Sequence, residues 1–223
     1  MLFLVSFTLA VSALAAPLER RAPAGVPSFV TQYAPIVYLY SGDLYRPADI
    51  GTQLANTSPY LNFTPITNGP NPLTLDNLNA LNNLGGKDIY LTSKVDINTR
   101  PSWIYGVTPD STGKTGNAIS SAVVVNDHGN GIVDAFYFYF YAFDYGGTYL
   151  GFTIGDHVGD WEHNMVRFTN GKPTAVWYSQ HSNGEAFTYA TTSKYNGSVR
   201  VSCTVRECFE FDLALTISIA DNV

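Results

Sequence analysis

A run of nine residues, 155–163, carries most of the side chains in this sequence that could do chemistry. It reads Gly-Asp-His-Val-Gly-Asp-Trp-Glu-His and holds two of the four histidines, three carboxylates and one of the three tryptophans. Such a cluster can bind a divalent metal, hold a sugar or move protons. It can equally be a buried hydrogen-bond network that only orients strands. The residue types alone leave these alternatives open.

Mixed oxygen and nitrogen ligands make a metal site one hypothesis. Asp160 and Glu162, with His157 from the preceding loop and His181 from the next strand, would supply them. This set suits calcium, magnesium, manganese or zinc, and the absence of nearby thiols argues against a closed structural zinc site. The spacing is not a specific signature such as H-E-x-x-H. A divalent cation is therefore predicted without a motif that names it.

Catalysis by two carboxylates is the alternative hypothesis. Asp160 and Glu162 lie two residues apart, so on one strand each could shift the pKa of the other, as paired carboxylates do in hydrolases. The sequence has no G-x-S-x-G elbow and no cysteine placed as a nucleophile. Binding is therefore favoured over enzymatic activity, and a secreted hydrolase with Asp160 or Glu162 as acid or base stays as the alternative.

A hairpin fixes which of these residues should face one another. Asn170-Gly171 is a favoured two-residue turn, which places Thr169 opposite Lys172. Counting back in pairs places Glu162 opposite Ser179 and Asp160 opposite His181, all four on one face. Nearer the turn the same face would carry Val166, Phe168, Ala175 and Trp177.

The predicted arrangement is a pocket with an apolar floor and an acidic rim. The predicted metal ligands are His157, Asp160, Glu162 and His181. The predicted ligand pocket consists of Trp161, His163, Ser179 and Trp177. The expected ligand is a glycan or a lipid headgroup.

The elements around this pocket read as sheet. Charged residues are only 13% of the chain and aromatic residues 14%, a composition typical of strands. Strands are predicted over 33–40, 122–125 and 132–141, with a turn over 126–131 that leaves His128 exposed. In the last strand Phe136, Phe138 and Phe140 alternate with Tyr137, Tyr139 and Tyr141. The phenylalanines are predicted to face the core, since they carry no hydroxyl to satisfy.

Two short helices are predicted in the N-terminal third. One runs over 47–54, where Pro47 favours a helix start, and the other begins at a Thr74 cap and ends at Gly85-Gly86. The fold class predicted from these elements is mostly β, an antiparallel β-sandwich with two short helices.

The N-terminus predicts a secretory protein. Residues 1–16 are typical of a signal peptide, and residues 17–21 form a pro-segment that ends in a dibasic pair suited to a kexin-type protease of the fungal secretory pathway. The β domain would span 22–198. Asn56, Asn62 and Asn196 begin N-glycosylation sequons. The expected location is the secretory pathway, ending outside the cell or in the vacuole.

Charge and hydropathy restrict the partners. The net charge of −6 argues against nucleic acid, and no further apolar run predicts a transmembrane segment. We expect a monomer.

Four separated blocks carry a resemblance to a known family. The blocks 34–40, 131–139, 155–163 and 179–185 resemble the vacuolar protein sorting-associated protein 62 family, and the likeness covers about 33–195. The resemblance implies a link to vacuolar sorting for a fungal secreted member and assigns no reaction.

A fainter resemblance is to the necrosis- and ethylene-inducing-like cytolysins. His157, Asp160, Trp161 and Glu162 match the end of their signature heptapeptide, while Gly159 stands where that family has histidine. This resemblance implies a divalent cation beside a sugar pocket and makes a membrane-active protein the third alternative.

The C-terminal segment departs from the family pattern. Residues 199–223 contain both cysteines, Cys203 and Cys208, followed by an apolar run. We expect an aberrant tail, from a truncated or frame-shifted gene or a retained intron. Whether the two cysteines pair stays open.

Overall fold

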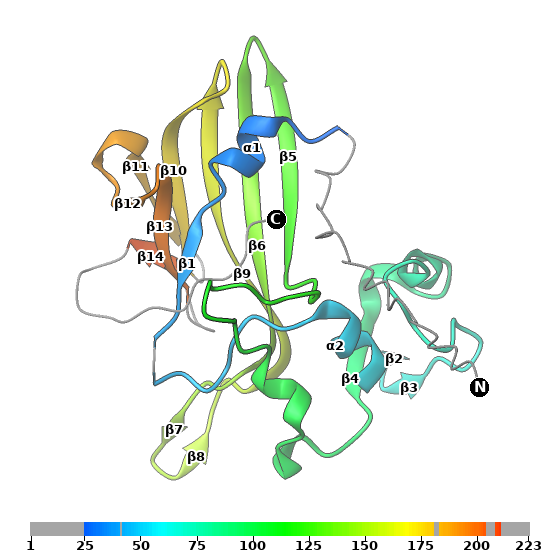
Figure 1. Ribbon diagram of the computed structural model, residues 1–223. Coiled ribbons are helices and arrows are strands. Elements are labelled where there is room, and N and C mark those ends of the chain that lie inside the picture. Colours follow the sequence, from blue (N-terminus) through cyan, green and yellow to red (C-terminus); the bar gives the residue numbers. More distant parts are fainter. Residues whose placement is uncertain (1–24, 41, 181–182, 204–207, 211–223) are drawn as a thin grey trace, which may run out of the picture.

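A five-stranded antiparallel sheet forms the centre of the protein. The computed structural model describes residues 25–40, 42–180, 183–203 and 208–210, so the predicted signal peptide and pro-segment lie outside the described residues. The strand order is β11-β10-β9-β6-β5 (Figure 1). The bounds are β5 Ser121–Gly129, β6 Ile132–Asp144, β9 His157–Thr169, β10 Lys172–Gln180 and β11 Asn183–Thr188.

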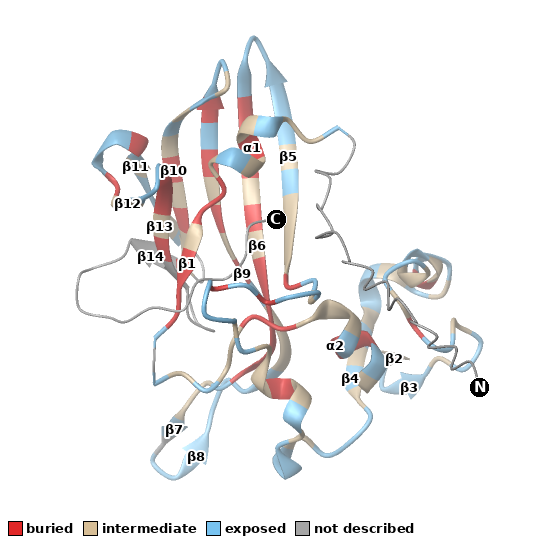
Figure 2. Cartoon of the chain, in the orientation of Figure 1, coloured by how far each residue is buried: buried red, intermediate tan, exposed pale blue. Residues whose placement is uncertain are grey.

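A smaller sheet packs over one face of the central sheet. Its strands are β1 Ile36–Tyr38, β12 Lys194–Tyr195, β13 Ser198–Cys203 and β14 Cys208–Glu210. Strand β13 lies between β1 and β12, and the short helix α1 (Ser28–Gln32) covers the same face (Figure 1). Apolar side chains from both layers form one core (Figure 2). The mostly-β sandwich is confirmed, although β1 runs parallel to β13, where antiparallel pairing was predicted.

Strand β13 crosses the boundary that the sequence suggested at residue 198. Val199 and Val201 are fully buried between the two sheets. Cys203 and Cys208 occupy opposite positions in the β13–β14 ladder. Residues up to 203 are therefore part of the sandwich, whereas 211–223 lie outside the described residues.

Tyrosines, not phenylalanines, point into the core. Tyr137, Tyr139 and Tyr141 are buried there, and Phe136 and Phe138 lie half-buried on the opposite face. Phe140 is buried as predicted, but in a separate small cluster with Ala48 and Ala142. The predicted orientation of β6 was wrong because a tyrosine can be buried at little cost in free energy when its hydroxyl forms a hydrogen bond.

Two of the buried hydroxyls have partners that are themselves in the core. The Tyr137 hydroxyl donates to the Val30 carbonyl at 2.7 Å, and the Tyr139 hydroxyl donates to Asn164 Oδ1 at 2.7 Å. Both acceptors come from other elements, α1 and β9, so the strand's own pattern does not reveal them.

The two helices of the N-terminal third are present with shifted bounds. Helix α2 (Ile50–Asn56) starts after Asp49, because the Asp49 carboxylate accepts from the Thr52 backbone N–H at 2.7 Å. The second is a 3₁₀ helix, η1 (Leu78–Asn83). Leucines at every third position fit its three residues per turn better than an α-helix.

Short elements complete the description. The strands β2 Thr57–Leu61, β3 Thr64–Pro65 and β4 Ile89–Ser93 form a separate small sheet, and β7 Thr148–Tyr149 pairs with β8 Phe152–Thr153. Further 3₁₀ helices are η2 Gly86–Asp88, η3 Ile97–Thr99, η4 Ser102–Tyr105 and η5 Tyr189–Thr191. In the part of the chain that the structure describes, no helix is long and apolar enough to cross a membrane.

Candidate functional site

A bulge in the β9–β10 hairpin decides how the candidate residues are distributed. The turn is as predicted, with Thr169 opposite Lys172 and positive φ at Asn170 and Gly171. The register then shifts between Pro173 and Ala175. Proline cannot donate a ladder hydrogen bond, and bulges are where a strand accommodates it.

The bulge overturns the predicted cross-strand pairs. Tyr178 lies opposite Asn164, so Ser179 cannot lie opposite Glu162, and the pairs of the sequence analysis are off by one residue. Because side chains alternate along a strand, a one-residue slip moves a whole set to the other face. His181 lies outside the described residues.

The two predicted groups consequently separate. Glu162 is buried on the core-facing side of β9, with Val166 and Phe168. Trp177 was predicted to share that face, but it lies against His163 on the outer face. Alternation places Trp161 and Ser179 on this outer face too. The structure thus brings the four predicted pocket residues onto one face and turns Glu162 away from them.

Rings from three strands form a continuous row on the outer face, which we call the aromatic row. It consists of Trp161, Phe138, His163 and Trp177. The ring centroids of Trp161 and Phe138 are 6.3 Å apart, those of Phe138 and His163 4.8 Å, and those of His163 and Trp177 5.5 Å. Trp161, at one end of the row, is 43% exposed, and its ring also lies 4.9 Å from the buried ring of Phe140. Partial burial lowers the pKa of His163, which keeps its ring neutral within the row.

The Trp177 ring lies against the backbone of the neighbouring strand. A Cβ atom on Gly184 of β11 would come within 2.2 Å of Trp177 Cζ2 and 2.4 Å of the Tyr178 carbonyl oxygen. Glycine at 184 therefore lets the indole lie across β11.

We expect Gly184→Ala to displace Trp177 and to lower the free energy of unfolding by about 1–3 kcal/mol, the usual cost of overpacking. The melting temperature should fall by several degrees and the tryptophan emission should shift. The exposed neighbour Glu185, replaced by alanine, serves as the control and should change neither. An unchanged emission spectrum in Gly184→Ala would mean that the indole does not lie over this glycine.

A second cluster, the histidine–aspartate cluster, lies where β6 ends and β9 begins. His157 Nε2 is 3.3 Å from Asp160 Oδ1, and His157 Nδ1 is 3.6 Å from Asp144 Oδ2. Nδ1–H also donates to the Gly155 carbonyl at 2.8 Å. Desolvation acts to lower the pKa of His157, but the Gly155 carbonyl and the two carboxylates outweigh it and raise that pKa.

The arrangement of this cluster does not by itself make a metal site. Among the described residues, no three His, Cys, Asp or Glu side chains are grouped to hold an ion. Asp160 is engaged with His157, and Glu162 belongs to the core. The contact between the His157 imidazole and the Asp160 carboxylate is explained as an ion pair, without a metal ion.

The raised His157 pKa predicts a pH-dependent stability. A histidine whose folded-state pKa is raised stabilises the fold fully below its unfolded value, 6.5, and the contribution disappears as pH rises through the folded value. Since the ring is about half exposed, the contribution is expected to be about 1 kcal/mol or less. Melting curves of the parent and His157→Asn should therefore differ most in mild acid and converge in alkali. A difference that stays constant with pH would contradict the cluster.

An ion-pair network at the opposite end of the outer face was not predicted from the sequence. Arg167 donates through Nε and Nη2 to the two oxygens of Asp134, both at 2.7 Å, and His128 Nε2–H donates to the same carboxylate at 2.8 Å. The Arg167 hydrogen bonds lower the pKa of Asp134 against the effect of its burial. His128 is exposed, as predicted, but it lies on strand β5, which extends to Gly129, and is bound to Asp134 of β6 instead of lying in a loose turn. The register of the β5–β6 hairpin could have revealed this contact, because it brings the end of β5 beside Asp134. The prediction of a turn over 126–131 left this part of β5 out of the strand.

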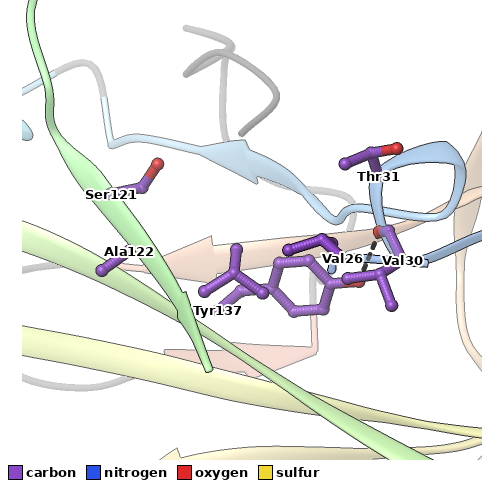
Figure 3. A pocket seen from close by; sticks show the side chains of 7 residues that line it. Val26, Val30, Thr31, Ser121, Ala122 and Tyr137 are labelled. Carbon is purple, nitrogen blue, oxygen red and sulfur yellow. Dashed lines mark hydrogen bonds between the residues drawn. The ribbon is translucent and has the colours of Figure 1, made fainter. Parts of the chain in front are cut away.

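An apolar cavity of about 240 Å³ lies away from both clusters, beside α1 and β5 (Figure 3). It is lined by Val26, Val30, Thr31, Ser121, Ala122, Val123 and Tyr137. The Tyr137 hydroxyl is already bonded to the Val30 carbonyl, so the cavity offers few polar groups to orient a ligand.

The sequons differ in accessibility. Asn62 and Asn196 sit in exposed turns with positive φ, whereas the Asn56 amide donates to the Thr52 carbonyl at the end of α2. N-glycosylation stays a prediction, and its best positions are Asn62 and Asn196.

Fold and candidate site define a β-sandwich protein with an aromatic face. The family model of vacuolar protein sorting-associated protein 62 matches residues 148–203, which include β9, β10 and β13. The chain belongs to the vacuolar protein sorting-associated protein 62 family.

Two relatives from Saccharomyces cerevisiae cover most of the chain. One, named "Putative vacuolar protein sorting-associated protein TDA6", is 38% identical over 187 residues, which are 78% of this chain and 40% of the relative. The other, named "Vacuolar protein sorting-associated protein 62", is 34% identical over 191 residues, 79% of this chain and 40% of the relative. The chain thus spans about 40% of the length of these curated relatives.

Solved structures share its outline more distantly. "Toxin fold for microbial attack and plant defense" matches with a TM-score of 0.46 and 14% identity, covering 87% of this chain and 72% of that one. "NLPPya in complex with glucosamine" matches with a TM-score of 0.44 and 15% identity, covering 87% and 71%.

Proposed function

We propose that this chain is a non-enzymatic carbohydrate-binding protein of the secretory or vacuolar route, and that the aromatic row is its sugar-binding face. The observation that carries the proposal is the placement of Trp161 and Trp177 on one sheet face, joined through His163 and Phe138. Sugar rings present patches of C–H groups that pack on aromatic faces, and Trp offers the largest such surface.

Polar groups beside the rings supply orientation. His163 is kept neutral by its burial, so one ring nitrogen donates and the other accepts, and Ser179 on the same face adds a hydroxyl. Neutral donors and acceptors suit the hydroxyls of a neutral sugar. The same chemistry would recognise a free glycan or the sugar headgroup of a glycolipid.

The distribution of carboxylates argues against the hydrolase alternative. A glycosidase needs two carboxyl groups that reach one scissile bond from an open site. Here Asp160 is 3.3 Å from His157, and Glu162 is buried on the opposite side of its strand from the aromatic row. Binding without turnover is the reading that we favour.

A divalent cation remains a separate proposal. His157 and Asp160 are close enough together to supply two ligands. Of the other two predicted ligands, Glu162 is buried and His181 lies outside the described residues. Calorimetric titration with calcium, magnesium, manganese and zinc tests it, because a bound ion must also raise the melting temperature.

A glycan array tests the proposed function. We expect the labelled protein to bind a subset of glycans, and free sugar should compete for that binding. The Trp161→Ala/Trp177→Ala double variant should lose every spot while it keeps a cooperative melt. Absence of binding across the array, or an unchanged pattern in the double variant, would overturn the proposal.

A further inference from the structure

The β7–β8 hairpin ends in an exposed apolar tip. Leu150, Phe152 and Ile154 are 95%, 72% and 61% exposed. The hairpin projects beyond the ends of β6 and β9, away from both sheets (Figure 1). Single exposed apolar residues are normal in proteins, but three within five residues on a projection indicate an interaction site.

Leucine is also an unfavourable choice for the tip. Leu150 and Gly151 form a two-residue turn with φ of +50° and +83°. Such turns favour Asn, Asp or Gly at the first position, because other side chains are strained there. Exposure and backbone both disfavour Leu150 in the described fold, and a contact made by the tip beyond the described residues would account for it.

The hairpin changes in polarity from tip to base. Residues 145–155 contain no charged side chain. Leu150 is at the tip, Tyr145 at the base bonds its hydroxyl to Thr148 Oγ1 at 2.9 Å, and beyond the base come Asp144 and Asp156. This order of apolar, tyrosine and charged residues matches the order of acyl chain, headgroup and water at a membrane surface.

We propose that the β7–β8 hairpin inserts its tip into the interfacial region of a lipid bilayer. The two residue steps from Thr148 to Leu150 at the tip span about 7 Å at strand rise, which lies within the depth of about 5–10 Å that interfacial apolar segments reach. A bilayer suits this projecting hairpin better than a protein groove does, since insertion into a bilayer requires no complementary shape.

The hairpin is held in shape before any contact. Asp156 Oδ1 accepts from the Gly146 backbone N–H at 2.9 Å, and the Ile154 N–H donates to the Gly147 carbonyl at 3.1 Å. Gly146 allows this close packing, because a Cβ there would lie 1.9 Å from the Ile154 carbonyl oxygen. Pairing within the hairpin limits the backbone groups that would enter lipid unsatisfied.

The charges at the base set the lipid preference. Asp144 is buried and paired with His157, but Asp156 and the overall charge of −6 would be repelled by anionic headgroups. Binding should therefore be to neutral bilayers and should depend weakly on salt. This inference does not rest on the sugar-binding proposal, because vesicles without carbohydrate suffice to test it.

Flotation with pure phosphatidylcholine vesicles provides the test, using the protein secreted by a eukaryotic host. We expect the parent protein to float with the vesicles. The Leu150→Asn variant should lower the partition coefficient about tenfold, the effect of losing one buried leucine side chain. Since Asn suits the turn, its melting temperature should stay the same or rise, which separates lost binding from lost folding.

A matched control comes from the β2–β3 turn. Phe63 is 98% exposed and also has a positive φ, but it is a single apolar residue on another part of the surface. The Phe63→Asn variant should float like the parent. Failure of the parent to float, or equal flotation of Leu150→Asn, would overturn the proposal and would leave a protein partner as the occupant of the hairpin.

Discussion

The Val201→Asp variant is expected to be unfolded at 25 °C. Val201 is fully buried in β13, which joins β1 and packs against the central sheet. A carboxylate there would have no described cationic partner in the core, and an unpaired buried charge costs more than about 4 kcal/mol. That approaches the whole stability of a typical domain, about 5–15 kcal/mol.

Circular dichroism and thermal denaturation measure this effect. Asn196→Asp makes the same change in charge in an exposed turn, where Asp tolerates the positive φ, and should melt like the parent. If Val201→Asp keeps a cooperative melt within a few degrees of the parent, then residues 199–203 are not part of the core and the sequence-based boundary at 198 was right.

Loss of the Trp177 indole is expected to weaken sugar binding about 30-fold or more. Aromatic anchors at the centre of a binding face contribute about 2 kcal/mol or more each, which corresponds to this factor. Trp177 lies between His163 and the backbone at Gly184, so its ring is already ordered before a sugar arrives. Little entropy would then be lost on binding.

Calorimetry with a glycan selected on the array compares Trp177→Ala with the parent. Tyr90→Ala removes a more exposed aromatic ring from β4, in a different sheet, and should bind like the parent. Equal affinities of Trp177→Ala and the parent would exclude the indole as an anchor.

Local patterns predicted much of the framework. The Asn170-Gly171 turn, the long aromatic strand and the strand before it are where the sequence placed them, because turn chemistry and alternation act within a few residues. The mostly-β class followed from the same signals. The Leu75, Leu78 and Leu81 spacing predicted a helix but not its 3₁₀ form.

The misses depend on contacts between distant segments. Tyr139 faces the core in place of Phe138 because Asn164 accepts a hydrogen bond from its hydroxyl. Asn164 lies 25 residues away in the sequence. Val201 was assigned to a tail because residues 199–223 depart from the family pattern. Its partner in β1, Val37, lies more than 160 residues earlier in the chain, so no local signal placed Val201 in a sheet. No window of sequence contains both members of such a pair.

The predicted arrangement of the candidate site was wrong because of a one-residue bulge in the β9–β10 hairpin. Strict pairing from the turn combined Glu162 and Trp177 on one face, and the bulge after Pro173 separated them. Proline was the available cue, since it forces an irregularity without showing where the register shifts. The same shift brings the four pocket residues onto one face, because it turns Trp177 and Ser179 to the side of Trp161 and His163.

The three tryptophans allow the central claim to be tested in one spectrum. Each gives one indole N–H signal, and Trp103 packs beside Ala48, Phe140 and Ala142, outside the aromatic row. On titration of the ¹⁵N-labelled protein with the selected glycan, the Trp161 and Trp177 indole signals should shift together and by more than that of Trp103, which is linked to Trp161 only through Phe140. Shifts confined to Trp103 or to the histidine–aspartate cluster would contradict a sugar-binding face on the aromatic row.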